Sequence, residues 1–258
     1  MNLVFNHRMF DHVNDTLKKE KGEFSRALSF ASRALRNPVI VFLLGCLEVP
    51  ATTLLCLPIP VYSSLIYLWI TNARGLPRFG GMYLRGLYYR GKLGSMASNV
   101  FIDQGVFFAF PKGVRLSEFS FIDKNVIIMS KTAHVGRRVH IAPRVFVSGG
   151  GEFEICDYAC IATNSNIITS TEVLKDGIRC SGPMTPPYQR NVMRSKVRIE
   201  KDAFVGANVT ILPGVTMAQG SVAGAGITLT RDTQTWGIYV GPKAEQKALR
   251  EPVRWDGD

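Results

Sequence analysis

The stretch from Val197 to Leu229 reads VRIEKDAFVGANVTILPGVTMAQGSVAGAGITL, and every sixth residue from Ile199 onward is apolar or small. A helix repeats every 3.6 residues and a strand every two, so neither explains this period. A coil with three flat faces does, because each face uses six residues and turns one side chain inward. Three faces make one turn of about eighteen residues, and such turns stack into a solenoid.

The same period recurs upstream of this stretch. Its inward positions are Ile102, Phe108 and Val114; Ile122 and Ile128; Val135, Ile141 and Val147; and Ile155, Ile161 and Ile167. We therefore predict an all-β domain, a parallel β-helix built from hexapeptide repeats, over residues 99–235. A C-terminal strand and tail follow over 236–258, and an α-helical, partly apolar region precedes the coils.

The repeat is interrupted between Ile167 and Ile199. Residues 168–198 contain Gly182-Pro183 and Pro186-Pro187, and glycine and proline at this density indicate an excursion from the coil. Long loops on a rigid scaffold usually carry function, because the scaffold fixes their ends. We predict that 168–198 is an acceptor loop.

The charge and the cysteine content indicate which kind of partner the protein binds and in which kind of compartment it lies. The 258 residues carry a formal net charge of +11, and residues 1–99 hold twelve Lys/Arg against five Asp/Glu. A basic half favours an anionic partner, either nucleic acid or a membrane, and the apolar segment described below favours the membrane. Five scattered cysteines give no disulfide framework and fit a reducing compartment. The polar, charged first 25 residues do not resemble a cleavable signal peptide.

Three segments precede the coils. Residues 1–37 carry an apolar stripe typical of one amphipathic helix that ends at Asn37-Pro38, with positions Leu17, Phe24, Leu28, Ala31 and Leu35. Residues 38–73 contain Glu48 as their only charge up to Ile70 and exceed the roughly 20 residues that span a bilayer, but Pro50, Pro58 and Pro60 interrupt them.

Arginines flank this apolar segment on both sides, which disfavours a single crossing and favours a hairpin that enters the membrane and returns. The basic-aromatic connector 74–98, with Met82, Tyr83, Tyr88 and Tyr89 among arginines, is expected at the lipid boundary. The alternative is a helical arm packed on the coils or on a neighbouring subunit.

Residues 197–241 resemble the hexapeptide-repeat acyltransferases, most closely those that O-acetylate sugars of O-antigen or capsule, and a weaker resemblance covers 99–245. The motifs are Ala203-Phe204-Val205-Gly206 for the family's VWIG turn, Ile211-Leu212-Pro213-Gly214-Val215 for ILPGV, Thr230-Arg231-Asp232 for TKD, and Trp236-Gly237-Ile238-Tyr239-Val240-Gly241 for the strand before GNPA. The resemblance implies a left-handed parallel β-helix, usually trimeric, with acetyl-CoA along the groove between subunits.

Two positions depart from the family. Thr169 to Val173 match its T-x-T-H-P segment, so Glu172 stands where a catalytic histidine is common, and GNPA is shortened to Gly241-Pro242-Lys243-Ala244. A general base must reach the attacking group with a suitable pKa. Glu172, beside Tyr188, is the first candidate, and His140 or His134 is the alternative. His134 and His140 lie six residues apart on successive faces, so we expect no shared metal site.

The remaining site residues fall into two predicted sets. The acetyl-CoA set comprises small residues at turns and groups for the phosphates: Gly206, Ala207, Gly224, Ala225, Thr230, Arg231 and Lys243. The acceptor set lies on the excursion: Thr171, Asp176, Tyr188 and Arg190. The alternative is that these residues bind no ligand. Tight coil corners also favour Gly and Ala for reasons of space, and charged residues such as Arg and Lys are also common on a solvated surface.

We therefore expect an acetyl-CoA-dependent O-acetyltransferase that acts on a sugar hydroxyl of a cell-envelope glycan (O-antigen, capsule or exopolysaccharide) or its precursor. Its expected partners are acetyl-CoA, a carbohydrate acceptor, two further copies in a homotrimer and the cytoplasmic face of a bacterial inner membrane, with no nucleic acid and no metal. The alternatives are an N-acyltransferase of an amino-sugar nucleotide and a non-catalytic β-helix scaffold.

Overall fold

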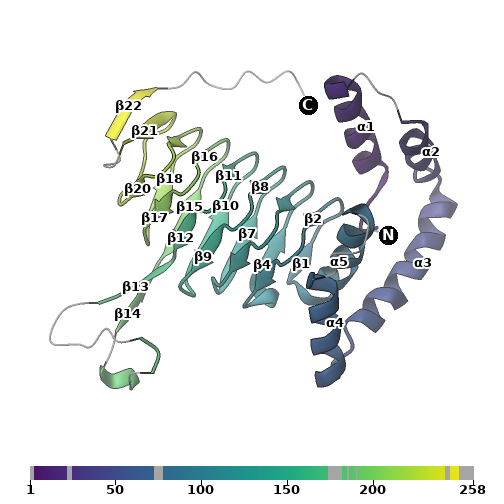
Figure 1. Ribbon diagram of the computed structural model, residues 1–258, viewed down its shortest axis with the longest axis horizontal. Coiled ribbons are helices and arrows are strands. Elements are labelled where there is room, and N and C mark those ends of the chain that lie inside the picture. The colour runs from purple at the N-terminus through teal and green to yellow at the C-terminus, as the bar shows by residue number, and fades with distance from the viewer. Residues whose placement is uncertain are drawn as a thin grey trace.

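A computed structural model describes residues 3–21, 25–72, 78–173, 182–184, 186–189, 191–241 and 245–249. The chain forms a β-solenoid of about seven turns with five helices gathered at its N-terminal end (Figure 1). The predicted hexapeptide-repeat solenoid with an α-helical N-terminal region is confirmed.

Three sheets form the faces of the solenoid, called sheets A, B and C in chain order, and their strands are parallel except for the last strand of sheet B. Sheet A contains β1 (Ser95–Met96), β4 (Val114–Leu116), β7 (Thr132–Val135), β10 (Glu152–Ile155), β15 (Lys196–Ile199) and β18 (Thr216–Met217). Sheet B contains β2 (Phe101–Ile102), β5 (Phe121–Ile122), β8 (His140–Ile141), β11 (Cys160–Ile161), β16 (Phe204–Val205), β19 (Val222–Ala223), β21 (Gly237–Val240) and β22 (Glu245–Leu249). Sheet C contains β3 (Phe107–Phe108), β6 (Ile127–Ile128), β9 (Phe146–Ser148), β12 (Asn166–Ile168), β17 (Thr210–Ile211) and β20 (Thr228–Leu229).

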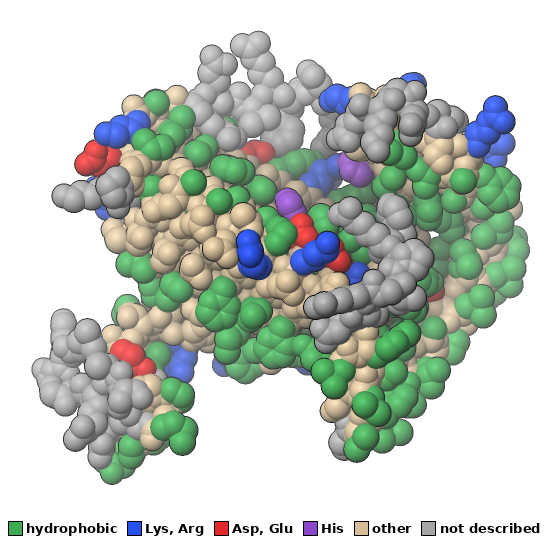
Figure 2. All heavy atoms as spheres, viewed as in Figure 1, with side chains coloured by type: hydrophobic (Ala, Val, Ile, Leu, Met, Phe, Trp, Pro, Cys, Tyr) green, Lys and Arg blue, Asp and Glu red, His purple; other side chains and the backbone are tan. Residues whose placement is uncertain are grey.

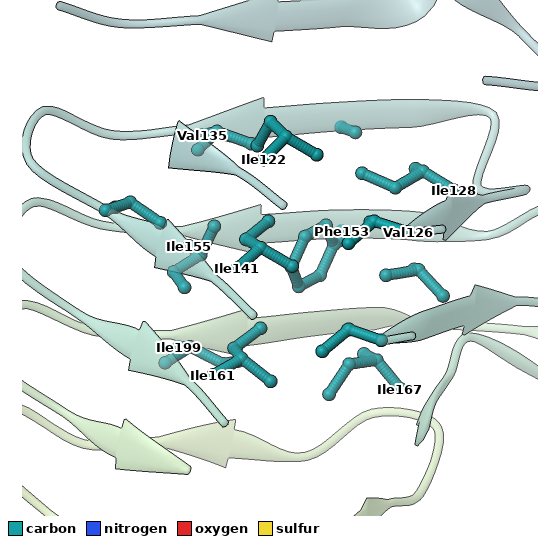
Figure 3. Packing of buried hydrophobic residues seen from close by; sticks show 14 of the residues in the cluster. Ile122, Val126, Ile128, Val135, Ile141, Phe153, Ile155, Ile161, Ile167 and Ile199 are labelled. Carbon is teal, nitrogen blue, oxygen red and sulfur yellow. The ribbon is translucent and has the colours of Figure 1, made fainter. Parts of the chain in front are cut away.

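The inward residues of successive turns stack on one another and form the core (Figure 3). In sheet B, Ile102 pairs with Ile122, Ile122 with Ile141, and Ile141 with Ile161. All four side chains are fully buried. These partners are 20, 19 and 20 residues apart, so the lower turns are longer than the predicted eighteen. The extra residues lie at the corners, which leaves the inward positions in register.

The corners after sheets A and B are closed by residues with a left-handed backbone, one in each turn. After sheet B these residues are Gly105, Asn125, Arg144, Asn164, Asn208 and Gly226. Glycine and asparagine adopt a positive φ at the lowest cost, which explains why they hold most of these positions. Asn164 Nδ2 also donates a hydrogen bond of 2.8 Å to Asn208 Oδ1 in the turn above.

The excursion from the coil begins directly after β12. Strands β13 (Ser170–Glu172) and β14 (Val192–Arg194) pair antiparallel and project away from the solenoid (Figure 1). The short helix η2 (Pro187–Gln189) lies on it, whereas η1 (Pro111–Gly113) lies before β4. At the other end of the chain, β22 pairs antiparallel with β21.

The apolar stripe of residues 17–35 belongs to two helices and not to one. Helix α1 (His7–Lys21) and helix α2 (Arg26–Ala34) pack against each other, and the Ser25 hydroxyl caps α2 by accepting from the Leu28 N–H at 3.3 Å. Asn37 caps the next helix, α3 (Pro38–Leu55), so Pro38 begins a helix there.

Helix α3 and helix α4 (Pro60–Asn72) are joined by a short turn, and the pair is called the α3–α4 hairpin below. Of the three prolines expected to interrupt the segment, Pro50 lies inside α3, whereas Pro58 and Pro60 stand at the turn. Glu48, the only charged residue of α3, is buried. Its carboxylate accepts hydrogen bonds from Val4 N–H, Tyr83 O–H and Arg90 Nη1 at 2.9–3.2 Å.

Helix α5 (Arg78–Lys92) covers the open end of the solenoid. Tyr88 and Tyr89 are buried in the solenoid core, and Tyr89 O–H donates to Val106 O at 2.6 Å. The Arg85 side chain donates to Ile102 O at 2.8 Å and pairs with Asp103 at 3.4 Å. The prediction that the rings of this connector lie at a lipid boundary is therefore wrong for Tyr88 and Tyr89, because they pack on the first turn.

Candidate active site

The candidate site lies on the outward side of sheet B. Side chains alternate between the inside and the outside of a strand, so each residue before an inward position faces outward. From the first turn upward this outward row is Phe101, Phe121, His140, Cys160, Phe204, Val222 and Ile238. His140 is the third residue of this row, and it is the only one with an imidazole, beside aromatic, aliphatic and thiol side chains.

His140 is held by two neighbours from the turn below. Its Nε2 lies 3.4 Å from Asp123 Oδ2, and its ring stacks on Phe121 with the ring centroids 5.2 Å apart and the planes at 16°. Asp123 is itself fixed, because its Oδ1 accepts the Lys124 N–H at 2.7 Å. The His140 side chain remains 43% exposed, whereas that of Asp123 is 16% exposed. The imidazole is thus oriented and still open to a substrate.

A histidine oriented by a carboxylate is suited to general base chemistry. With Nε2 donating its proton to Asp123, Nδ1 keeps a lone pair for an incoming proton. The carboxylate then stabilises the imidazolium that forms, as it does in other histidine–aspartate pairs. The sequence interpretation missed Asp123. With the turn length of 19 residues that the structure shows, Ile122 aligns with Ile141 and Phe121 with His140. Asp123 then lies on the same outward side as His140, one rung below it.

Cys160 occupies the next rung above His140. Burial raises the pKa of the Cys160 thiol, so at neutral pH it stays protonated and is a poor nucleophile. The pair His140 and Cys160 therefore supports a base acting on a substrate and does not support a covalent cysteine intermediate.

Four of the predicted cofactor residues lie at the corner after sheet B. Gly206 N–H donates to Ala223 O, and Gly224 N–H donates to Tyr239 O, both at 2.7 Å. A Cβ at Gly206 would stand 2.7 Å from Ala223 O and from Ala225 N. The packing of one turn on the next thus requires glycine here, which is the structural alternative for this residue. The corner lies above His140 by two or three rungs of about 4.8 Å each, roughly 10–14 Å.

Thr230 and Arg231 lie at a different corner. They follow β20, so they stand between sheets C and A, and both are exposed. The next residue, Asp232, accepts the Thr216 N–H at 2.7 Å and so holds this corner together. The structure therefore divides the predicted cofactor set between two corners, one on each side of sheet C. Lys243 lies outside the described residues.

The predicted acceptor residues are distributed over the excursion. Thr171 and Glu172 lie in β13 opposite Met193 and Val192, and Tyr188 is 82% exposed. Asp176 and Arg190 lie outside the described residues. Because β13 projects away from the solenoid, Glu172 and His140 stand on separate parts of the molecule (Figure 1). The two base candidates are not brought together within one chain.

His134, the third base candidate, faces outward from sheet A. It stands between Arg115 below and Glu154 above, beside a groove of about 480 Å³. Burial tends to raise the pKa of Glu154, but the hydrogen bond from Lys196 and the charges of Arg198, Lys196 and His134 outweigh it and lower that pKa. The two histidines face outward from different sheets, so they do not chelate one ion within this chain.

The geometry defines a parallel β-helix with an oriented histidine on one face, and comparison with known proteins finds the repeat from which such a helix is built. The family model "Hexapeptide repeat of succinyl-transferase" matches residues 196–231. The chain therefore carries a hexapeptide repeat like that of the hexapeptide-repeat acyltransferases, and the proteins similar to it include a sugar O-acetyltransferase and sugar N-acyltransferases.

Two curated relatives are similar to this chain over a little under half of its length. The chain is 30% identical over 107 residues to the dTDP-4-amino-4,6-dideoxy-D-glucose acyltransferase of Escherichia coli, matching 42% of this chain and 55% of that protein. It is 32% identical over 124 residues to WbbJ of Escherichia coli K12, a candidate lipopolysaccharide biosynthesis O-acetyl transferase, matching 48% of this chain and 59% of WbbJ. The chain thus spans little more than half the length of these curated relatives.

Among solved structures, the chain is similar to a variant of AntD, an N-acyltransferase from Bacillus cereus in complex with dTDP and coenzyme A. The TM-score is 0.58 at 25% identity, covering 62% of this chain and 85% of AntD.

Proposed function

We propose that this chain is an acetyl-CoA-dependent O-acetyltransferase that acts on a sugar hydroxyl, with His140 as the general base. The observation that carries this proposal is the pair His140–Asp123 on the outward side of sheet B, in which the imidazole is oriented at 3.4 Å and still 43% exposed. A hydroxyl is a weak nucleophile and must lose its proton as it attacks, so it needs such a base.

In this proposal His140 Nδ1 takes the hydroxyl proton while the oxygen attacks the thioester carbonyl. A new C–O bond forms, and the carbonyl electrons move to the oxygen, which accepts hydrogen bonds from backbone N–H groups. When this oxyanion collapses, the C–S bond breaks and the sulfur leaves with the proton that His140 returns. Asp123 stabilises the imidazolium between these two transfers.

We propose that acetyl-CoA runs along the corner after sheet B, past Gly206, Ala207, Gly224 and Ala225, with its thioester directed down toward His140. The small side chains at this corner allow a ligand to approach the backbone closely. The family groove implies that a second subunit forms the other wall, so we propose a homotrimer. In that assembly Thr171 and Tyr188 of one excursion would contact the acceptor in a neighbouring subunit's site.

The second candidate function is N-acylation of an amino-sugar nucleotide. It is favoured by two relatives, one of which is a dTDP-4-amino-4,6-dideoxy-D-glucose acyltransferase and the other an N-acyltransferase crystallised with dTDP and coenzyme A. A neutral amine attacks before it loses its proton, so this reaction makes a smaller demand on His140. In either case we propose an envelope-glycan precursor as the acceptor, because WbbJ carries a lipopolysaccharide name.

Two measurements test these proposals in sequence. Acetyl-CoA at millimolar concentration should raise the unfolding midpoint, because a ligand that binds only the native state stabilises it. CoA release is then measured with dTDP-6-deoxyglucose and with dTDP-4-amino-4,6-dideoxyglucose, which differ only by a hydroxyl or an amine at C4. Faster release with the hydroxyl supports O-acetylation, and faster release with the amine supports the second candidate. Absence of a thermal shift would favour the β-helix scaffold and overturn both enzymatic proposals.

A further inference from the structure

The outer side of the α3–α4 hairpin is apolar although it faces away from the protein. On α3, Phe42, Leu43 and Leu47 are 57–67% exposed, and on α4, Val61 and Leu65 are 61–72% exposed. Figure 2 shows hydrophobic side chains gathered along the edge of the molecule that α3 and α4 form. A surface helix of a globular protein normally turns its polar residues outward. Contiguous exposed apolar area of this kind indicates a partner surface.

The polar groups of the hairpin are turned inward or bonded within the hairpin itself. Glu48 is directed at α5 and the N-terminal segment, where three donors meet its carboxylate. Thr53 Oγ1 donates to Val49 O at 3.0 Å, one turn earlier in the same helix. Tyr62 O–H donates at 2.9 Å to Leu54 O at the end of α3, which also accepts the Leu57 N–H at 3.4 Å.

This internal satisfaction of polar groups is what hydrocarbon requires, because lipid tails offer no hydrogen bonds. A protein interface differs, since it normally carries a polar rim and about one hydrogen bond per 100–200 Å². The outer face of α3 is formed by residues such as Phe42, Leu43 and Leu47, and it presents no charged side chain among the described residues. Lipid is therefore favoured over a second copy as the occupant.

Charge on both sides of the hairpin points to an anionic lipid surface. The exposed arginines Arg26 and Arg33 lie on α2, and Lys92 ends α5. Arg36, directly after α2, is also exposed but pairs with Asp11 at 2.8 Å. Basic residues near an apolar anchor add attraction to anionic headgroups. Trp69, which is 52% exposed near the end of α4, is a residue type that favours the boundary between lipid and water.

Helix length and the Glu48 contacts decide how the hairpin sits. Helix α4 has 13 residues, which is about 20 Å and shorter than the roughly 30 Å of a hydrocarbon core. Helix α3 could cross by length, but one side of it packs on α5, where a Cβ at Gly91 would lie 3.1 Å from Thr52 Cγ2. A helix tied to the protein along one face cannot be surrounded by lipid.

We propose that the α3–α4 hairpin docks this protein onto an anionic bilayer from one side, with the outer faces of both helices and the turn residues 57–59 in the lipid. This proposal does not depend on the chemistry proposed for His140. It places the solenoid, whose first turn α5 covers, directly at the membrane surface.

Flotation with lipid vesicles tests the docking. The full chain, exchanged from detergent, should float with phosphatidylglycerol–phosphatidylethanolamine vesicles and less with phosphatidylcholine vesicles. The variant Leu43→Gln/Leu47→Gln should lower the partition coefficient about a hundredfold, because two large apolar side chains leave the lipid. Val240→Gln/Leu249→Gln is the matched control, since it makes the same change at exposed positions on β21 and β22 and should float like the parent.

Flotation of an α4 variant and cysteine labelling at the turn also test the docking. Val61→Gln/Leu65→Gln alters the other helix and should also reduce flotation, with native folding of each variant checked by circular dichroism. In a chain whose only cysteine is Leu57→Cys, an impermeant maleimide should fail to react from either side of sealed vesicles. Labelling from the lumen would show a crossing and overturn one-sided docking. Parent-like flotation of both hairpin variants, or a stable dimer in water that Leu43→Gln/Leu47→Gln dissociates, would overturn the lipid surface itself.

Discussion

Replacing Asp123 by asparagine tests the proposed base most directly. The substitution keeps the shape of the side chain and an oxygen that can accept the Lys124 N–H, but it removes the negative charge beside His140. Two unit charges at 4 Å interact by about 1 kcal/mol in water and about 4 kcal/mol near a protein surface. Because His140 is 43% exposed, we take about 1–2 kcal/mol for its imidazolium, which corresponds to a fall in kcat of about 5–30-fold.

The assay is CoA release under saturating acetyl-CoA, with the acceptor that gives turnover in the parent. His140→Ala should lower kcat by about 10²–10⁴-fold, the usual contribution of a general base. Asp123→Asn should have no further effect in the His140→Ala background, because the carboxylate acts only through the imidazole. The KM for acetyl-CoA should not change in Asp123→Asn. If the two substitutions multiply, or if Glu172→Gln abolishes turnover while His140→Ala does not, the assignment of His140 is refuted.

Three other predictions concern stability and are measured as unfolding in detergent solution. Glu48→Ala should destabilise the fold by about 3 kcal/mol, because it removes the buried acceptor of Val4 N–H and Tyr83 O–H and the carboxylate that faces Arg90; a variant as stable as the parent would contradict the Glu48 contacts. Ile161→Ala, at a fully buried core position, should cost about 2–5 kcal/mol, whereas Val240→Gln on the surface should cost little. Because the pKa of Glu154 is lowered in the folded state, its contribution to stability is present above the ordinary carboxylate pKa of about 4.3 and is lost as the pH falls through the lowered value. Glu154→Gln should therefore make the unfolding midpoint less sensitive to acid between about pH 5 and pH 3. An unchanged acid sensitivity would contradict the ion pairs of Glu154 with Lys196 and Arg198.

The repeat made the solenoid predictable because every inward position is constrained by the same geometry. A residue such as Ile141 has one neighbour above and one below, so the period alone places it. The contacts of the helices were harder to predict. In the sequence, Arg85 and Tyr89 belong to a basic and aromatic segment, and only the fold brings Ile102 O, Asp103 and Val106 O to them. Their partners lie 17 or 18 residues away, a separation that no local pattern encodes.

Only one residue of the proposed base pair could be predicted from the sequence, for a related reason. His140 follows from the inward–outward alternation of a strand, whereas its partner Asp123 depends on the length of the turn between them. That turn is one residue longer than the ideal repeat. The motif comparison that led to Glu172 identifies a position along the chain, and the projecting hairpin then carries that position away from sheet B.

Helix α5 also has a role in keeping the chain from assembling end to end. The first turn of a β-helix leaves three strands with unpaired backbone groups, and open edges of this kind are templates for aggregation. Arg85 and Tyr89 occupy two of these carbonyls, at Ile102 and Val106. A chain that begins at Ser95 should therefore form fibres or aggregates in light scattering, even though it keeps every repeat. Helix α5, which connects the solenoid to the α3–α4 hairpin, thus also caps the open end of the solenoid and prevents it from aggregating through that end.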